Sequence, residues 1–273
     1  MRKPSLFLTI LFVITVLSAQ WTASGVWADT REVFQEQIDP GRGAQLTVKN
    51  VNGSVTVKSD DIDYIRVKAE KKTNKGQDEL DKVGIDISNG DDIVVEVVVL
   101  DRGLFNRHPK VSVDFEITVP RELGVKRLES VNGRIRASEI AGDLTARTTN
   151  GKVIIERPAD RITARTTNGS IEVNEAASVR KVSTTNGSVD VSLVKPFTGD
   201  CEIKTVNGSV KVAVPFDLDA DVDLGVVNGS VNVSELSLNL HSATKKSLKA
   251  KLRSGGPEIR VRTTNGSIRL RRK

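Results

Sequence analysis

The sequence predicts an all-β protein, a single-stranded parallel β-solenoid (β-helix-like) in which each turn of the chain adds one rung to a stack. The first observation behind this prediction is a repeat with a fixed spelling. The dipeptide Asn-Gly, with an aliphatic residue three positions after the Asn, recurs at Asn52, Asn132, Asn150, Asn168, Asn186, Asn207, Asn228 and Asn265. From Asn132 onward the spacings are 18, 18, 18, 21, 21 and 37 residues. A period of about 20 residues is typical of stacked repeat proteins.

The second observation is alternation on both sides of each Asn-Gly. Apolar side chains precede the Asn at even offsets, as Leu144 and Ala146 do, and follow it at odd offsets, as Val153 and Ile155 do. Period-two alternation is typical of half-buried strands. The change of parity places a tight corner at Asn-Gly, two residues that readily adopt positive φ.

Two architectures fit these corners. Each Asn-Gly could be a type I′ hairpin turn in an antiparallel β-meander, or a solenoid corner with equivalent residues stacked rung upon rung. The solenoid explains why every corner is spelled alike, because Asn stacked on Asn and Thr stacked on Thr can form hydrogen-bonded ladders. Eight rungs would then make a rod about 4 nm long.

Residues 1–28 are predicted to be a signal peptide. Arg2 and Lys3 precede an apolar run from Leu6 to Leu17, which is short for a membrane span, and Val26-Trp27-Ala28 fits a cleavage site before Asp29. The mature chain is therefore expected to lie outside the cytoplasm, in the periplasm or at the cell surface or secreted, with no transmembrane span.

Residues 29–120 are expected to form an N-terminal β-rich segment that holds the first repeat and an insertion. Strands are expected near residues 65–69, 93–100 and 111–119, with a loop at 101–110 and one helical turn at 78–83. Residues 121–273 are expected to form the solenoid repeats. Pro196-Phe197 and Pro215-Phe216 lengthen two rungs, and residues 247–253 alternate like a strand in a rung without Asn-Gly.

Three stretches resemble the putative-adhesin family of exported bacterial β-repeat proteins of unknown function, also called toast-rack domains. They are Phe115 to Pro120, the run Leu128-Glu129-Ser130-Val131-Asn132-Gly133-Arg134-Ile135, and the closing segment from Gly255 to Ile268. The resemblance covers nearly the whole mature chain. It implies a β-helix-like stack with no known catalytic residues.

The residues offer little chemistry, so no catalytic, cofactor-binding or metal site is predicted. Cys201, the only cysteine, falls on the inward parity, and His108 and His241 lie in no ligand spacing. Glu172 and Asp190 would stack as outward carboxylates, which leaves a carbohydrate-active β-solenoid enzyme as the alternative function. Against it, both tryptophans lie within the signal segment. Few aromatic platforms remain for sugars or nucleobases, so nucleic acid is not an expected partner.

Basic residues give the functional prediction. Residues 245–273 carry eleven Lys and Arg against one acid, whereas residues 29–244 have 28 basic and 34 acidic residues. Three residues before the Asn, an outward column holds Lys49, Arg147, Arg165, Lys204 and Arg262, and Arg260, Arg269 and Arg271 are expected on the same exterior. We expect a non-enzymatic, envelope-associated interaction module that docks through its basic C-terminal end to an anionic envelope polymer, a lipid headgroup or an acidic protein. The same charges could instead only protect the open edge of a solenoid end. The basic C-terminal end disfavours a third interpretation, in which the protein is a purely structural rod that self-associates end to end.

Overall fold

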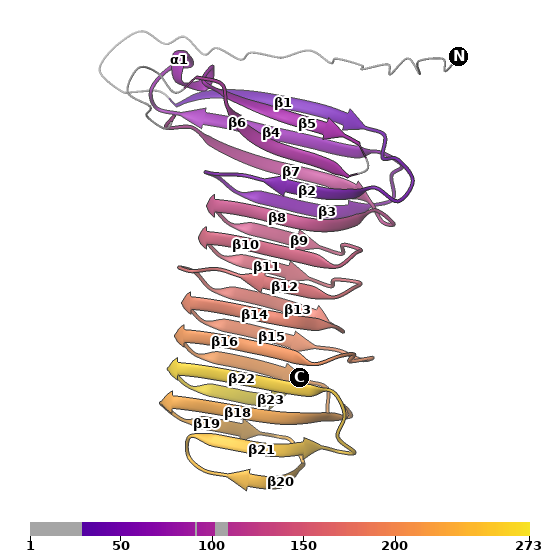
Figure 1. The fold of residues 1–273 in the computed structure, drawn as a ribbon, viewed down its shortest axis with the longest axis vertical. Coiled ribbons are helices and arrows are strands. Elements are labelled where there is room, and N and C mark those ends of the chain that lie inside the picture. Colours follow the sequence, from indigo (N-terminus) through magenta and orange to yellow (C-terminus); the bar gives the residue numbers. More distant parts are fainter. Residues whose placement is uncertain (1–28, 91, 102–108) are drawn as a thin grey trace.

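The protein is a long rod built from two facing β-sheets (Figure 1). The structure, a computed structural model, describes residues 29–90, 92–101 and 109–273, so the predicted signal peptide lies outside the described residues. We call the 11-stranded sheet "sheet A" and the 12-stranded sheet "sheet B". At each of the eight repeat Asn-Gly corners, from Asn52 to Asn265, the chain turns from sheet B into sheet A, and each such pair of strands is one rung of the stack.

Eight rungs contain the Asn-Gly corner, and equivalent strands of neighbouring rungs pair in parallel. From the N-terminal end of the rod, the sheet B strands are β2 (Gln45–Lys49), β8 (Gly124–Asn132), β10 (Leu144–Asn150), β12 (Ile162–Arg165), β14 (Val179–Asn186), β16 (Cys201–Asn207), β22 (Glu258–Asn265) and β18 (Ala220–Asn228). Their sheet A counterparts are β3 (Val55–Asp60), β9 (Ile135–Ser138), β11 (Val153–Glu156), β13 (Ile171–Ala176), β15 (Val189–Leu193), β17 (Val210–Val214), β23 (Ile268–Arg272) and β19 (Val231–Ser234). The parallel solenoid is therefore confirmed, and the antiparallel meander is wrong for the repeats.

The core is the space between the two sheets, and the predicted parity fills it. Ile155 and Ile203 are fully buried there, as are most residues at the same offsets in other rungs. Cys201 is also buried, and this burial raises the pKa of its thiol to about 12. A thiol with that pKa stays protonated near neutral pH, which suits a small core residue rather than a nucleophile.

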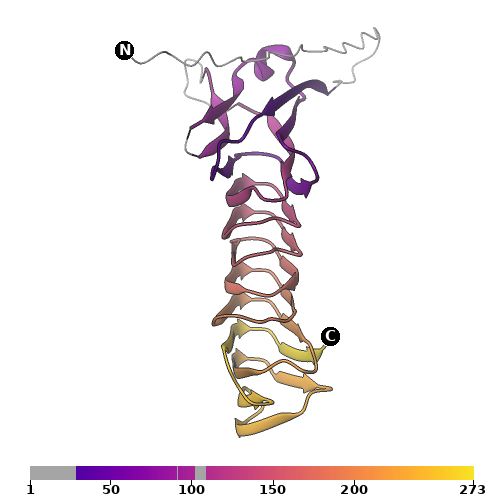
Figure 2. The ribbon, with the colours of Figure 1, turned by 90° about the vertical axis from the view of Figure 1, so that its right-hand side faces the viewer.

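The N-terminal end, which we call the head, extends both sheets beyond the first rung. Next to the first rung lie β6 (Ile93–Val99) in sheet B and β7 (Ser112–Pro120) in sheet A, both parallel to their neighbours. Antiparallel strands then complete the sheets: β5 (Val83–Asn89) on β6, β4 (Ile65–Thr73) on β7, and β1 (Thr30–Ile38) on β4. The helix α1 (Gln77–Leu80) lies at this end and buries Leu80, where the sequence predicted a helical turn at 78–83. Figure 2 shows the sheets spreading apart in the head.

The other end, which we call the tip, does not hold the C-terminal rung. The rung of β22 and β23 lies inside the stack, between the rung of β16 and β17 and the rung of β18 and β19. Beyond β18 come β21 (Ser247–Leu252) and β20 (Leu238–Ala243), both antiparallel. The expectation of a basic terminal rung is therefore wrong, because β22 and β23 each pair on both edges. The strand predicted at 247–253 exists, but it is an antiparallel addition rather than a rung.

The corners form a continuous ladder of asparagine side chains. Each Asn donates its Nδ2 to the Oδ1 of the Asn on the head side, over distances of 2.7 to 2.9 Å, from Asn228 through Asn265 up to Asn52. The predicted Asn ladder is thus confirmed. The threonines behave differently from the prediction, because hydroxyls such as that of Thr166 bond the glycine carbonyl of the neighbouring rung and not another threonine.

The corner glycines are required for space. A Cβ on Gly151 would lie 2.0 Å from the carbonyl oxygen of Gly133, and the next corners repeat this geometry. None of the eight ladder asparagines has positive φ, whereas four of the corner glycines do: Gly53, Gly187, Gly229 and Gly266, at 109° to 159°. The expected positive φ is therefore wrong for the asparagines and holds at only half of the glycines. Close stacking acts at the other corners too, because a side chain on a glycine such as Gly151 would strike the neighbouring backbone.

Candidate anion-binding face

The outward residues three positions before each Asn form one column along sheet B. In register from head to tip, the column holds Lys49, Glu129, Arg147, Arg165, Ser183, Lys204, Arg262 and Gly225. Neighbouring members lie one strand spacing apart, roughly 4.8 Å. The column is therefore mostly cationic over the length of the repeats.

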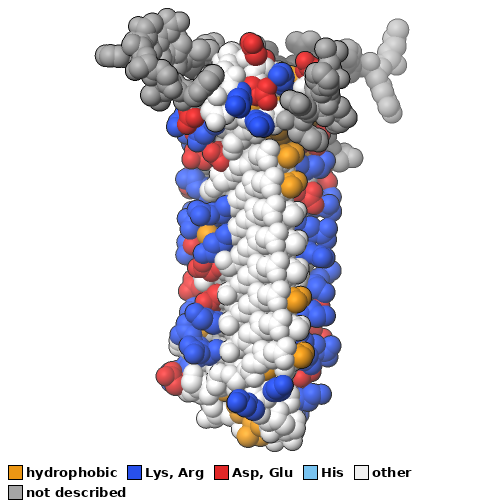
Figure 3. Space-filling model, turned by 90° about the vertical axis from the view of Figure 1, so that its left-hand side faces the viewer, with side chains coloured by type: hydrophobic (Ala, Val, Ile, Leu, Met, Phe, Trp, Pro, Cys, Tyr) orange, Lys and Arg blue, Asp and Glu red, His pale blue; other side chains and the backbone are white. Residues whose placement is uncertain are grey.

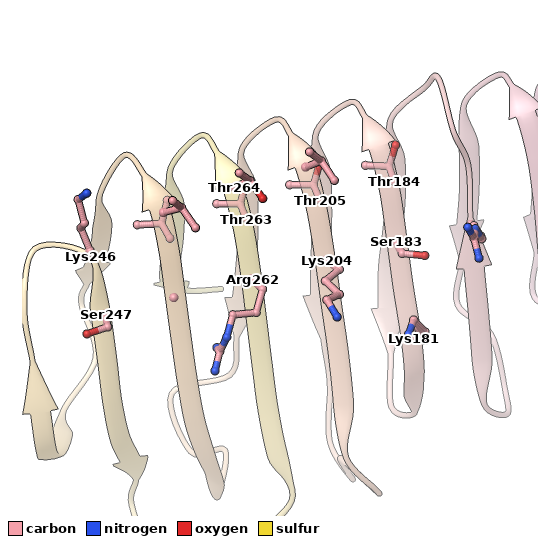
Figure 4. A pocket seen from close by; sticks show the side chains of 15 residues that line it. Lys181, Ser183, Thr184, Lys204, Thr205, Lys246, Ser247, Arg262, Thr263 and Thr264 are labelled. Atoms are coloured by element: carbon pink, nitrogen blue, oxygen red, sulfur yellow. The ribbon is translucent and has the colours of Figure 1, made fainter.

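Two adjoining hollows lie along this column and share Arg165. The hollow on the head side has a volume of about 340 Å³ and extends from Lys49 to Arg165. The hollow on the tip side has a volume of about 620 Å³ and extends from Arg165 to Lys246. Figure 4 shows Lys204 and Arg262 on neighbouring strands of the second hollow, with Thr205 and Thr263 nearer the corners. We call the two hollows together "the trough".

Arg147 and Arg165 form an exposed cationic pair in the trough. They lie in register on β10 and β12, within two identical stretches, Thr-Ala-Arg-Thr-Thr-Asn, at residues 145–150 and 163–168. Neither guanidinium has an ion pair or a hydrogen bond to any residue that the structure describes. Like charges directly opposite each other on neighbouring strands are destabilising. The two guanidiniums are therefore adjacent positive charges with no counter-charge among the described residues.

Threonine hydroxyls flank this arginine pair on both sides. Thr145 and Thr163 precede the arginines by two positions, and Thr149 and Thr167 follow them by two, so all four share the outer face of sheet B. None of the four hydroxyls has a hydrogen-bond partner within the described protein. The surface thus offers neutral donors beside each guanidinium.

Towards the tip, the cations of the trough are partly compensated. The Nζ of Lys204 lies 3.1 Å from a carboxylate oxygen of Glu202, which also pairs with Lys181 at 2.7 Å. Hydrogen bonds from Lys181 and then Lys204 lower the pKa of Glu202. Arg262 donates to the carboxylate of Asp223 at 2.5 Å and to its backbone carbonyl at 2.8 Å. An incoming anion would compete with these carboxylates.

The seven basic residues predicted from the sequence do not share one surface. Arg147, Arg165, Lys204 and Arg262 lie in the sheet B column, and Arg260 lies beside it on β22. Arg260 pairs with Glu258 at 2.7 Å, and this hydrogen bond is the main cause of its raised pKa. Arg269 and Arg271 lie on β23 in sheet A, on the opposite side of the rod. The sequence also missed Lys246, because only the fold places it at the tip end of the trough.

The stacked carboxylates proposed for an enzyme do lie in register on sheet A. Glu172 is next to Asp190, but it pairs with Lys152 at 2.6 Å and accepts a hydrogen bond from Asn174. The Lys152 bond first, and the Asn174 bond second, lower the pKa of Glu172. A general acid in glycoside cleavage needs a raised pKa. Glu172 is therefore suited to an ion pair rather than to proton donation.

An uncharged strip separates the two outer faces on the corner side of the rod. Figure 3 views this side and shows a white strip along the length of the repeats with charged columns on both flanks. The corner asparagines, glycines and serines account for this strip. Sheet A and sheet B thus present separate charged surfaces.

The fold and this surface define a β-solenoid repeat protein with one extended cationic trough. The chain belongs to the Toastrack DUF4097 family, whose family model matches residues 41–271. No helix among the described residues is long and apolar enough to cross a membrane. Within the same residues, no group of three or more His, Cys, Asp or Glu side chains could hold a metal ion.

Several solved structures are similar to this chain at low identity. A "putative adhesin" from Bacteroides fragilis NCTC 9343 shares 13% identity at a TM-score of 0.46, covering 87% of this chain and 96% of that one. A "putative lipid binding protein" from Parabacteroides distasonis ATCC 8503 shares 14% identity at 0.43, covering 88% and 96%. A "putative cell adhesion protein" from Clostridium sporogenes ATCC 15579 shares 11% identity at 0.37, covering 90% and 100%. Comparison with curated proteins gives no match.

Proposed function

We propose that this protein is an exported, non-enzymatic, adhesin-like module of the cell envelope that binds an anionic surface component through the sheet B trough. The observation that carries the proposal is the in-register pair Arg147 and Arg165, which has no acidic partner in the described protein. Two adjacent cations without counterions are unfavourable in the free protein and become favourable when an anion binds.

The geometry supports binding along the side of the rod rather than at its end. The trough continues from Lys49 to Lys246, so one extended ligand can contact several rungs at once. Many weak contacts to one long ligand add up through effective concentration. The C-terminal rung, in contrast, lies inside the stack and offers no free end.

A binding experiment tests this proposal with a matched pair of variants. The mature protein is incubated with an isolated envelope fraction over a range of salt concentrations, and the bound fraction is measured. The double variant Arg147→Gln/Arg165→Gln removes two in-register cations from sheet B. The control Lys211→Gln/Arg269→Gln removes two in-register cations from sheet A.

We expect binding of the unaltered protein to fall steeply with salt, because exposed charges are screened within about 10 Å at 0.1 M. The sheet B variant should bind several-fold less at low salt, and the sheet A control should bind like the unaltered protein. Binding that does not depend on salt concentration, or an equal loss of binding in both variants, would show that the trough is not the binding surface.

Export has its own test. The full-length chain, with its predicted signal segment, is expressed in a bacterial host and the N-terminus of the recovered protein is identified by mass spectrometry. Cleavage before Asp29 and recovery outside the cytoplasm are expected. Recovery of uncleaved protein in the cytoplasm would contradict export.

A further inference from the structure

We infer that the occupant of the trough is a linear phosphate polymer that lies lengthwise along sheet B from Arg147 towards the tip. This inference rests on the proposed function and specifies its ligand class. It combines three observations: the shape of the trough, the chemistry of its lining and the position of its only acidic member.

The shape favours a chain over a membrane. The cations line hollows along one column of residues, and uncharged residues such as Val206 and Thr264 border the tip-side hollow nearest the corners. A thin, extended ligand can enter such a hollow and follow it across the rungs. A planar bilayer cannot bend into a hollow, whereas a thin chain can contact its lining from one rung to the next.

The lining favours phosphate over sugar rings or bases. No aromatic side chain lines either hollow, although polysaccharides and nucleobases are usually held on aromatic faces. Arginine guanidiniums with neighbouring hydroxyls are, in contrast, common partners of phosphate oxygens. At Arg147 and Arg165, two guanidiniums and four free threonine hydroxyls meet this description.

Glu129, the acidic residue of the sheet B column, marks the head-side limit of the proposed site. Glu129 lies next to Arg147 on the head side, and it pairs with Arg127 at 3.4 Å. Lys49, beyond it, is engaged by Glu96 at 3.0 Å. The carboxylate of Glu129 would repel a polyanion, whereas the column from Arg147 to Gly225 holds no acidic residue. A polyanion would therefore extend from Arg147 towards the tip.

Towards the tip, small residues alternate with the cations. Ser183 separates the Arg147 and Arg165 pair from the Lys204 and Arg262 pair, and Gly225 follows before Lys246. From β10 to β21 there are six strand spacings, which is roughly 3 nm. This is the length over which each added phosphate should strengthen binding.

The test uses end-labelled inorganic polyphosphate of graded chain lengths and poly(glycerol phosphate), with affinity measured by fluorescence anisotropy. Polygalacturonate of matched length supplies carboxylates in place of phosphates, and phosphatidylglycerol vesicles supply phosphate on a planar surface. The proteins are the mature chain, the sheet B variant Arg147→Gln/Arg165→Gln and the sheet A control Lys211→Gln/Arg269→Gln. Thermal melting checks that all three fold alike.

We expect affinity for both phosphate polymers to rise with length and to level off once the chain spans roughly 3 nm. The sheet B variant should lose at least about tenfold in affinity, since two charge-assisted contacts are removed. The sheet A control should lose less than about twofold, as rim charges do.

Three results would overturn the inference: equal affinity for polygalacturonate, tighter binding to vesicles than to free polymer, or equal losses in the two variants. The proposed function fails separately. If phosphate polymers do not bind but the sheet B variant still loses envelope binding, only the ligand class is wrong. If envelope binding is also insensitive to the sheet B variant, the trough has no docking role.

Discussion

At the scale of single residues, the corner glycine Gly151 is required because of its neighbour one rung away and not because of its own backbone angles. Gly151 faces the carbonyl of Gly133 at a distance that leaves no room for a Cβ. We therefore predict that Gly151→Ala destabilises the protein by roughly 1–3 kcal/mol, as overpacking does. Gly41→Ala is the control, because nothing lies within 4 Å of its Cβ position. Urea unfolding measures both variants, and equal stability would contradict the stacking argument.

The asparagine ladder gives a second prediction at this scale. Asn168 donates to Asn150 at 2.8 Å and accepts from Asn186 at 2.9 Å, whereas Asn228 makes a single ladder bond, to Asn265. Asn168→Ala should therefore cost about 2 kcal/mol and Asn228→Ala about 1 kcal/mol, at about 1 kcal/mol for each bond. Unfolding free energies compare the two. If the terminal and internal substitutions cost the same, the ladder does not act bond by bond.

A third prediction concerns pH and the head. Burial raises the pKa of Asp114, but hydrogen bonds from the backbone and side chain of Ser54, and then from Lys72, outweigh it and leave the pKa lowered. A lowered folded-state pKa means that the stabilisation is complete above the usual aspartate pKa of about 3.9 and is lost as pH falls through the folded value.

Asp114→Asn should accordingly cost about 1 kcal/mol at pH 7 and progressively less in acid. Stability curves from pH 7 down to pH 2 measure this. Asp143→Asn is the control, because Asp143 is an exposed carboxylate without an ion pair in the described structure. A cost that stays constant with pH would show that Asp114 acts through packing instead.

At the scale of elements, the decisive feature is the insertion of the β22 and β23 rung between two rungs that precede it in the sequence. Ile259, Val261, Ile268 and Leu270 from this rung are fully buried. Deleting residues 258–273 therefore removes interior packing and separates β18 from the stack. We predict that amides of β18 and β21 lose hydrogen-exchange protection in the truncated protein, while β10 and β12 keep it, because repeat stability is largely local. Unchanged protection in β18 would contradict the insertion.

The elements also show what the sequence could predict. Alternation around each Asn-Gly predicts the strands, their inward faces and the asparagine ladder, because these depend on local pattern and on identical residues stacking. The order of the rungs in the stack does not follow from local sequence, because the stretch Arg262-Thr263-Thr264-Asn265 would fit beside several rungs equally well. One signal was present: Val226 replaces the threonine that bonds a glycine carbonyl in other late rungs, which marks that rung as exceptional.

Local sequence does not predict which rungs become neighbours, and this limit also explains which residues of the candidate site could be predicted. The column with Arg147 and Arg165 follows directly from the repeat and was predicted. Arg269 and Arg271 were assigned to the same exterior, but they follow a corner and so lie in the other sheet. Lys246 joins the trough only because β21 pairs with β18 in the antiparallel sense.

At the scale of the whole molecule, the solenoid stacks one short sequence motif many times, so that equivalent side chains form a long surface along the rod. One side of the rod carries the trough, and the corner strip beside it is uncharged. The opposite sheet carries mixed charges, some of them held in ion pairs such as Lys152 with Glu172. Like charges stacked at strand spacing repel each other, and an anion on sheet B would relieve that repulsion. We therefore propose that the molecule binds its ligand along its length.

We propose that anions bind on sheet B between Arg147 and Lys246, and arginine-selective chemical footprinting of the unaltered protein tests this binding most directly. The protein is modified with and without an envelope fraction, and the extent of reaction at each arginine is measured by mass spectrometry. We predict that Arg147 and Arg165 become strongly protected, while Arg269 and Arg271 react as in the free protein. Protection of Arg269 and Arg271, with Arg147 and Arg165 unchanged, would contradict the account.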